Sequence, residues 1–302
     1  MINFIKSISI GIRPKTLSAS IAPVLVGSAI AFKSSIECCT NDCFDINILL
    51  LTLLAAIFIQ IGTNFANDVY DFINGADNDN RLGPLRVVQA NLISIRSMKI
   101  LTAVAFLLSI ICGLPLVAAG GFPILIIGLL SIICGYAYTA GPYPLGYNGW
   151  GDIFVFIFFG PIAVCGTFYL QLGYISIESI ISGTILGCLS VTLLCVNNIR
   201  DVETDKKAGK RTIAVRFGVK IVKIIFIGLF FVSYFLSGYL AFSCNFLNIN
   251  LFILLLILTI PLFIKICLDT FKLKSQELNS VLVSVSIFIS FFSILLIISI
   301  LA

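Results

Sequence analysis

Runs of about 20 apolar residues recur along the chain, and this repetition limits the fold more than any other feature. A helix of about 20 apolar residues can cross the roughly 30 Å hydrocarbon core of a bilayer. Hydrophobic residues make up 59% of the 302 residues and charged residues 11%, far below the roughly 25% charged residues of soluble domains. We therefore predict an all-α polytopic membrane protein with a single transmembrane domain over residues 1–302. Nine spans are predicted, at residues 16–32, 46–66, 100–118, 121–140, 151–172, 177–197, 219–243, 246–267 and 280–301.

Some boundaries of these spans are irregular. Pro23 interrupts the first span, and the short gap at residues 119–121 is consistent with a tight hairpin between the third and fourth spans. The basic N-terminal region with Lys6 and Arg13 resembles the start of a signal peptide. Because apolar spans recur to the end of the chain, we predict no cleavage.

The distribution of Lys and Arg predicts the orientation. Nine spans with a cytoplasmic N-terminus place every Lys and Arg except Lys33 on the cytoplasmic side, as the positive-inside rule requires. The net charge of +5 follows from this bias. It therefore does not indicate a nucleic-acid partner, and we expect none.

An acidic stretch begins where the second apolar run stops. The first Asp-rich motif covers residues 64–81 and starts Asn-Phe-Ala-Asn-Asp-Val-Tyr-Asp. Helical spacing at i, i+4 and i+7 places Asn64, Asp68 and Asp71 on one face. Ionisable groups are costly at a membrane edge and usually functional, so we interpret this face as a site.

A second Asp-rich motif, residues 197–212, repeats the arrangement at the end of the sixth apolar run. Asn197, Asp201 and Asp205 follow one another at i, i+4 and i+8. In both motifs glycine and cations come next. The parallel suggests two similar four-helix halves, with a ninth helix added after them.

Two further features allow two interpretations each. Arg13, just before the first span, either lies at the interface as a topology signal or reaches an anionic ligand. The turn at residues 136–152 holds four tyrosines and the only tryptophan, without Lys or Arg. It is either an interfacial aromatic belt or an aromatic wall for a flat or cationic ligand.

The metal-binding chemistry follows from which residue types are present. The chain has no histidine, so the commonest metal ligand and general base is excluded. Its ten cysteines are mostly single residues in apolar runs, but Cys38, Cys39 and Cys43 share a loop and could pair or bind metal there. Four aspartates in two pairs therefore predict an oxygen-only site for Mg²⁺, whose remaining ligands are substrate phosphates and water. A long isoprenoid diphosphate fits such a site at the mouth of an apolar bundle.

The two motifs and the aromatic turn, with its Gly-Pro-Tyr-Pro-Leu-Gly-Tyr-Asn-Gly segment at residues 141–149, together resemble the UbiA-type intramembrane aromatic prenyltransferases. Within that group the chain looks most like the 1,4-dihydroxy-2-naphthoate polyprenyltransferases of menaquinone biosynthesis. The resemblance runs from Arg13 to Gly218, whereas the last two or three spans match only in hydrophobicity. We interpret those last spans as lipid-facing scaffold.

The resemblance implies transfer of a polyprenyl group from polyprenyl diphosphate to 1,4-dihydroxy-2-naphthoate, with loss of CO₂ and diphosphate, to give demethylmenaquinone. It implies a bacterial inner-membrane protein whose Mg²⁺-dependent active site faces the cytoplasm. The expected metal ligands are Asp68, Asp71, Asp201 and Asp205, and Asp77 is a further catalytic candidate by its motif position. The expected substrate and diphosphate contacts are Asn64, Asn67, Arg13, Arg81, Asn197, Asn198, Arg200, Lys206, Lys210, Tyr138, Tyr143 and Tyr147.

Other acceptors and one other class of protein remain as alternatives. The 4-hydroxybenzoate enzymes of this group usually carry basic residues after the fourth span, and residues 145–149 have none. A related naphthoate, 4-hydroxybenzoate, homogentisate or a haem precursor stays open as the acceptor. In an ion-coupled transporter, intramembrane acids bind cations near the midplane on broken helices, whereas these acids lie at one face.

Overall fold

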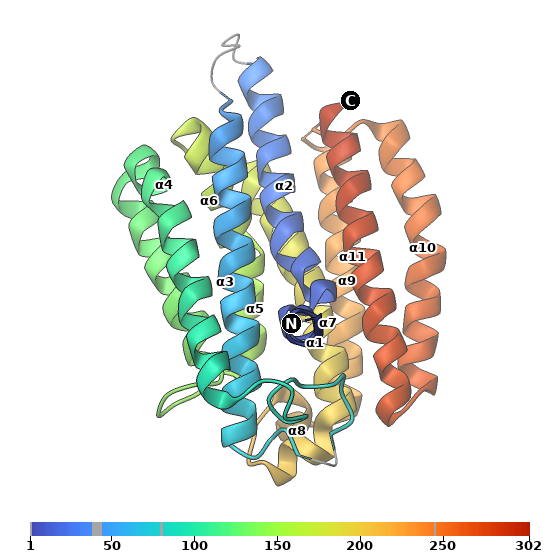
Figure 1. The fold of residues 1–302 in the computed structure, drawn as a ribbon. Coiled ribbons are helices and arrows are strands. Elements are labelled where there is room, and N and C mark those ends of the chain that lie inside the picture. Colours follow the sequence, from blue (N-terminus) through green and yellow to red (C-terminus); the bar gives the residue numbers. More distant parts are fainter. Residues whose placement is uncertain (1, 38–43, 79–80, 245) are drawn as a thin grey trace.

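The structure is a computed structural model that describes residues 2–37, 44–78, 81–244 and 246–302, and these residues fold into helices joined by loops (Figure 1). The predicted cysteine cluster at residues 38–43 lies outside the described residues. The helices are α1 (Ile2–Ile12), α2 (Pro14–Glu37), α3 (Ile46–Ile73), α4 (Ile95–Ala137), α5 (Gly151–Phe159), α6 (Pro161–Leu172), α7 (Ile177–Lys207), α8 (Ile213–Phe217), α9 (Val219–Phe242), α10 (Ile249–Lys272) and α11 (Leu278–Leu301), with a 3-10 turn at Ser275–Glu277.

Eight segments of the described chain are long and apolar enough to cross a membrane, with α5 and α6 counted together. The predicted polytopic, all-helical architecture is thus confirmed. The third and fourth predicted spans both lie in α4, which bends at Gly121, where φ is 67° and ψ is −154°. Met98, in the first turn of α4, packs with the C-terminal part of α3, and Tyr136, near the end of α4, contacts Tyr70 in that same part. Leu116, close to the bend of α4, packs near the start of α3. The two ends of α4 therefore lie at the same end of α3.

Helix α7 is the most buried spanning helix and forms the centre of the bundle. Phenylalanines of α9 and α11, such as Phe230 and Phe288, pack around it in the main core. The α5–α6 corner approaches α7 closely, because a Cβ on Gly183 would lie 2.8 Å from the Cα of Pro161. Close approach through small residues is how helices associate inside a bilayer, where apolar surface gains little by leaving lipid.

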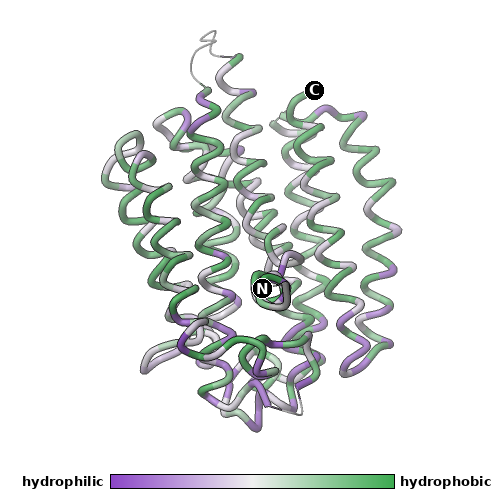
Figure 2. Tube along the Cα trace, viewed as in Figure 1, coloured by the Kyte–Doolittle hydropathy of each residue, from purple (hydrophilic) through white to green (hydrophobic). Residues whose placement is uncertain are grey.

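The polar segments gather at one end of the bundle, which we call the loop end. Residues 74–78, 81–94, 138–150 and 208–218 meet there, and Figure 2 shows the hydrophilic residues concentrated around them. Helix α1 is seen end-on near this end in Figure 1, so it lies across the direction of the spanning helices. Both Asp-rich motifs reach the loop end, because α3 and α7 end there.

Candidate active site

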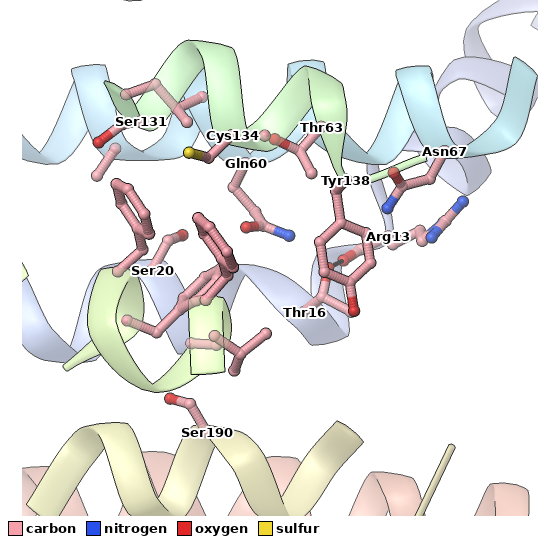
Figure 3. A pocket seen from close by; sticks show the side chains of 18 of the residues that line it. Arg13, Thr16, Ser20, Gln60, Thr63, Asn67, Ser131, Cys134, Tyr138 and Ser190 are labelled. Atoms are coloured by element: carbon pink, nitrogen blue, oxygen red, sulfur yellow. Dashed lines mark hydrogen bonds between the residues drawn. The ribbon is translucent and has the colours of Figure 1, made fainter. Parts of the chain in front are cut away.

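A cavity of about 1000 Å³ runs from the loop end into the bundle, between α2, α3, α4, the α5–α6 pair, α7 and the start of α11. Its deep part is lined mainly by apolar side chains, such as Leu129 and Phe158. Figure 3 shows Arg13, Asn67 and Tyr138 gathered at one end, with Gln60 projecting into the middle from α3. The cavity thus combines a charged mouth with an apolar interior.

Asp71 lies near the C-terminal end of α3 and joins three segments at the mouth. The Tyr147 hydroxyl donates to its Oδ1 at 2.9 Å, and Lys210 Nζ lies 3.1 Å from the same oxygen. Arg86 Nη2 lies 3.3 Å from the other oxygen, Oδ2. Burial raises the pKa of Tyr147, and the Asp71 charge raises it further, so the phenol stays neutral and serves as a donor.

Lys210 connects the two Asp-rich motifs. Its Nζ contacts Asp71 and lies 3.9 Å from Oδ1 of Asp205, and it stands 4.5 Å from the centre of the Tyr147 ring. Burial lowers the pKa of Lys210, but the charges of Asp71 and Asp205 outweigh burial and leave the pKa raised. The ammonium group is therefore charged at neutral pH, where it neutralises carboxylates from both motifs.

Asp68 anchors a loop. Its carboxylate is buried and accepts hydrogen bonds from the backbone N–H groups of Val87, at 3.2 Å, and Val88, at 2.9 Å. Arg13 Nη2 lies 3.7 Å away. Asp68 does not line the cavity, so its observed contacts hold the 81–92 segment against α3.

Asp77, in the loop after α3, pairs with two arginines. One carboxylate oxygen contacts Arg81, and the other lies 3.0 Å from Nε of Arg86. Burial raises the pKa of Asp77 to about 7, the Asp71 charge adds to this, and Arg81 opposes it. Asp77 is buried and does not line the cavity, whereas both arginines do. Its observed contacts therefore orient these two guanidinium groups.

The second motif presents Asp201 paired with its neighbour Arg200. Arg200 Nε donates to Oδ1 of Asp201 at 2.8 Å and Nη2 to Oδ2 at 2.6 Å, a bidentate pair. The remaining guanidinium nitrogen, Nη1, donates to Oδ1 of Asn279 at 2.7 Å. Asn279 belongs to α11, so the last helix also contributes to the mouth.

Asn64 and Arg13 fix the corner between α1 and α2. The Asn64 side chain donates to the carbonyl of Ile12 at 2.9 Å and to the Thr16 hydroxyl at 3.0 Å. Arg13 adopts a φ of 54° between the two helices and donates to the Asn64 carbonyl at 3.2 Å. A left-handed backbone is costly for arginine, and this network holds it in place with its side chain on the cavity.

Most of the predicted site residues meet at the cavity, but five do not line it. Tyr143 and Lys206 are exposed, and Asn64, Asp68 and Asp77 are buried behind the lining. The structure thus does not bring Tyr143 or Lys206 to the site, because Tyr143 is exposed on its loop and Lys206 is exposed on the last turn of α7. The twelve predicted residues that line the cavity are Arg13, Asn67, Asp71, Arg81, Tyr138, Tyr147, Asn197, Asn198, Arg200, Asp201, Asp205 and Lys210.

Sequence reasoning missed several polar residues of the site, including Arg86, Gln60 and Asn279. Arg86 lies in the loop after the first motif, where its charge could have marked it as a candidate. Gln60 is a polar residue inside a predicted span, on the cavity side of α3. Asn279 borders an apolar run without any motif around it, so no sequence signal pointed to it.

The donor set suits a hard cation only together with a phosphate ligand. Among the described residues, no three acids stand close enough to hold a metal ion by themselves. Asp71, Asp201 and Asp205 nevertheless offer carboxylates at one mouth. Mg²⁺ binds through one or two carboxylates while substrate phosphates and water complete its shell, so these residues fit that ion.

The fold and the site define a helical membrane protein that can hold an anionic head group at its mouth and an apolar tail in its interior. The chain belongs to the UbiA prenyltransferase family, whose sequence profile matches residues 20–292. It is thus a prenyltransferase, as the resemblance of the two motifs implied.

Relatives with assigned names support this membership. The 1,4-dihydroxy-2-naphthoate octaprenyltransferase of Escherichia coli K12 is 39% identical over 215 residues, which cover 68% of this chain and 67% of that protein. The protein of the same name from Mycobacterium tuberculosis H37Rv is 36% identical, covering 74% of each chain. A UbiA prenyltransferase domain-containing protein 1 from Dictyostelium discoideum is 31% identical over 91% of this chain and 82% of its own.

Solved structures share the fold. A UbiA homolog from Archaeoglobus fulgidus bound to GPP and Mg²⁺ has a TM-score of 0.63 at 19% identity, covering 96% of this chain and 99% of that one. The apo structure of a UbiA homolog from Aeropyrum pernix K1 has a TM-score of 0.69 at 15% identity, covering 93% and 98%.

Proposed function

We propose that this enzyme transfers a polyprenyl group from polyprenyl diphosphate to 1,4-dihydroxy-2-naphthoate. The observation that carries the proposal is the cavity itself, which joins a mouth of paired acids and cations to an apolar interior of about 1000 Å³. An amphipathic diphosphate with a long tail matches both parts. The names of the relatives at 36–39% identity point to the naphthoate acceptor.

The mouth provides the charges that a departing diphosphate needs. Arg81, Arg86 and Lys210 line it from two loops, and Arg200 adds a further guanidinium from α7. Charge-assisted hydrogen bonds to phosphate oxygens are the strong ones. Donors that are already oriented stabilise the charge that develops as the allylic carbon–oxygen bond breaks.

The mouth also provides ligands for Mg²⁺. We propose Asp71, Asp201 and Asp205 as the residues that would hold it, and we assign Asp68, the fourth predicted ligand, the role of anchoring the loop. Mg²⁺, when bound, supplies positive charge next to the phosphate oxygens. Without the ion, Lys210 Nζ contacts two of these carboxylates, Asp71 and Asp205. Lys210 therefore has to move toward the phosphate when the ion binds.

Two tyrosines stand where the allylic cation would form. Tyr138 and Tyr147 line the cavity beside Asp71, and the negative faces of their rings can stabilise a cation. The apolar walls below them exclude water, which would otherwise hydrolyse the cation. Tyr143, the third predicted aromatic contact, is exposed and has no part in this step.

A polar face of α3 offers a place for the acceptor. Gln60, Thr63 and Asn67 follow at i, i+3 and i+7, and all three line the cavity (Figure 3). At 1.5 Å per residue, Gln60 lies about 10 Å deeper than Asn67. A naphthoate held against this face has polar partners for its hydroxyl groups and lies beside the tyrosines.

In the proposed reaction the ring carbon that bears the carboxyl group attacks the allylic carbon. One carbon–carbon bond forms, diphosphate leaves with the electrons of the broken carbon–oxygen bond, and CO₂ departs to restore the aromatic ring. The product is the quinol form of demethylmenaquinone. We assign Asp77 the role of holding Arg81 and Arg86, because its carboxylate contacts both arginines and does not line the cavity.

We further propose nine membrane crossings, with α4 crossing twice around Gly121, and two similar halves followed by a ninth helix. The N-terminus and the loop end then face the cytoplasm of a bacterial inner membrane, in agreement with the positive-inside rule. A phosphatase reporter fused to the C-terminus tests this count. Nine crossings predict an active reporter outside the cytoplasm, whereas activity of a cytoplasmic reporter at the same position would contradict the count.

The function is tested with the purified protein and a prenyl diphosphate. We expect prenyl transfer with 1,4-dihydroxy-2-naphthoate, release of one diphosphate and one CO₂ per transfer, and loss of both after Mg²⁺ is chelated. Turnover with 4-hydroxybenzoate or homogentisate alone would refute the acceptor. Absence of diphosphate release with every aromatic acceptor would refute an aromatic acceptor.

A further inference from the structure

Asn279, near the start of α11, joins parts of the site that are far apart in the sequence. Its Oδ1 accepts a hydrogen bond from Nη1 of Arg200 at 2.7 Å. Its Nδ2 donates to the backbone carbonyl of Leu82 at 2.9 Å. One amide side chain thus bridges the loop after the first motif and the helix of the second motif.

Arg200 connects Asn279 to the carboxylate of Asp201. Arg200 is buried and uses Nε and Nη2 for its bidentate pair with Asp201, so Asn279 holds its third nitrogen. A guanidinium fixed at all three nitrogens cannot rotate. The direction of the Asp201 carboxylate therefore depends on Asn279 through Arg200.

The chemistry of this position explains why it is an asparagine. Leu82 presents an acceptor and Arg200 presents a donor, and an amide offers one group of each kind on a short side chain. A carboxylate would satisfy Arg200 but repel the Leu82 carbonyl. A leucine of similar shape would satisfy neither.

The loop on the other side of the bridge packs tightly. A Cβ on Gly83 would lie 2.8 Å from Nη2 of Arg81 and 3.0 Å from Nη2 of Arg200. An alanine at this position would therefore force the ends of both arginine side chains to shift. Asn279 holds this loop through the residue next to Gly83.

We propose that Asn279 is a positioning residue, which couples the 81–86 loop to the Arg200–Asp201 pair and so sets how the two Asp-rich motifs face each other around a diphosphate. The inference rests on the proposed function for the identity of the ligand. It assigns a role to α11, which sequence analysis interpreted as scaffold. The coupling itself is a property of the protein without ligand.

The test compares two substitutions with a matched control. Asn279→Leu removes both hydrogen bonds at similar volume, whereas Asn279→Asp keeps an acceptor for Arg200 and removes the donor to Leu82. The control, Asn250→Leu, makes the same change at an exposed position near the start of α10, at the opposite end of the bundle. Thermal unfolding of each full-length variant establishes that it is folded.

The first readout is hydrogen–deuterium exchange of residues 81–86 in the ligand-free protein. We expect faster exchange in both Asn279 variants and unchanged exchange in the control. The second readout is binding of inorganic diphosphate with Mg²⁺. A hydrogen bond to a charged group typically accounts for a factor of about ten or more in binding. We therefore expect at least a tenfold loss of diphosphate affinity in Asn279→Leu, which loses both hydrogen bonds, and a smaller loss in Asn279→Asp, which loses only the bond to Leu82.

Outcomes that overturn the proposal differ from those that overturn the function. Unchanged loop exchange in both variants would refute the coupling, and equal loss of diphosphate binding in both would refute the path through Arg200. If Asn279→Leu does not fold, exchange in Asn279→Asp decides alone. If the native protein binds no diphosphate or transfers no prenyl group, the proposed function fails, yet loop exchange still tests the bridge.

Discussion

Replacing Lys210 by methionine tests the centre of the site. Methionine keeps an unbranched side chain but removes the charge that bridges Asp71 and Asp205. A hydrogen bond between charged groups is worth about 1.5–3 kcal/mol, which corresponds to roughly a 10- to 150-fold change. We expect kcat/KM for the prenyl diphosphate to fall by about that factor, because the phosphate loses a cation in the transition state.

We expect the same substitution to increase the affinity for Mg²⁺. In the protein without ligand, the Lys210 ammonium group contacts Asp71 and Asp205, which we assign to Mg²⁺. Removing this ammonium group therefore removes its competition with Mg²⁺ for the two carboxylates. We expect half-saturation at a lower Mg²⁺ concentration in Lys210→Met, although turnover is slower. A general loss of structure would raise that concentration, so the two parameters together separate the mechanisms.

The pH dependence of the effect follows from the raised pKa of Lys210. A lysine whose pKa is raised by folding stays charged up to the pKa of the unfolded chain, about 10.4, and its contribution to stability is lost only above that. Lys210 also lowers the pKa of Asp77, which is about 7, so the ratio of native to Lys210→Met activity should be constant only above this titration, between about pH 8 and 10. A ratio that collapses within this window would show that the ammonium charge is not what matters.

The assay is radiometric prenyl transfer with purified protein in detergent, at varied diphosphate and Mg²⁺. Lys206→Met is the matched control, because Lys206 carries the same charge four residues away but is exposed and does not line the cavity. We expect less than a threefold change in this control. Native-like activity of Lys210→Met, or an equal loss in both variants, would refute the reasoning.

Three further predictions concern other parts of the cavity. Asp201→Asn should lower transfer at least about 100-fold and also destabilise the fold, because it leaves the buried Arg200 guanidinium without its carboxylate partner. Asp68→Asn should destabilise the fold by about 1–3 kcal/mol, because its amide faces a backbone N–H, but should lower transfer less, because Asp68 does not line the cavity; an equal loss of transfer in both folded variants would contradict this division. Gly83→Ala should raise KM for the diphosphate severalfold, since its Cβ displaces two guanidinium groups, and Gly228→Ala, where a Cβ meets open space, should leave KM unchanged. Gly128→Leu places a side chain in open space on the cavity wall, so turnover of long polyprenyl diphosphates should fall more than that of geranyl diphosphate, and an equal fall for both would argue against a tail there.

The two acid motifs illustrate how far sequence spacing goes. Asp68 and Asp71 were assigned to one face, but three residues correspond to a rotation of 300°, so the two carboxylates diverge by about 60°. That angle is enough for Asp68 to contact the amides of Val87 and Val88 while Asp71 reaches Lys210. Helical periodicity could not decide between these environments, because both arise from segments that follow the helix.

The positive charge of a residue likewise did not predict whether its side chain lines the cavity. Lys206 and Lys210 both follow Asp205 within five residues of sequence. Only Lys210 reaches the cavity. The chain continues as helix through Lys207, which leaves Lys206 on an exposed side, whereas Lys210 follows the turn at Gly209 and folds back toward Asp205. The end of a helix, which is uncertain from sequence by a residue or two, decides which lysine is functional.

The sequence by itself determined that the chain is a helical membrane protein with acids at the ends of two helices and an aromatic turn between them. These properties depend on local composition and periodicity, since the transfer of each segment into lipid depends on its own residues. Only the tertiary structure decided which carboxylates line the cavity, that Lys210 joins the two motifs, and that Asn279 meets Leu82 across 197 positions of sequence. Such contacts depend on how distant helices pack together, and no local pattern encodes them.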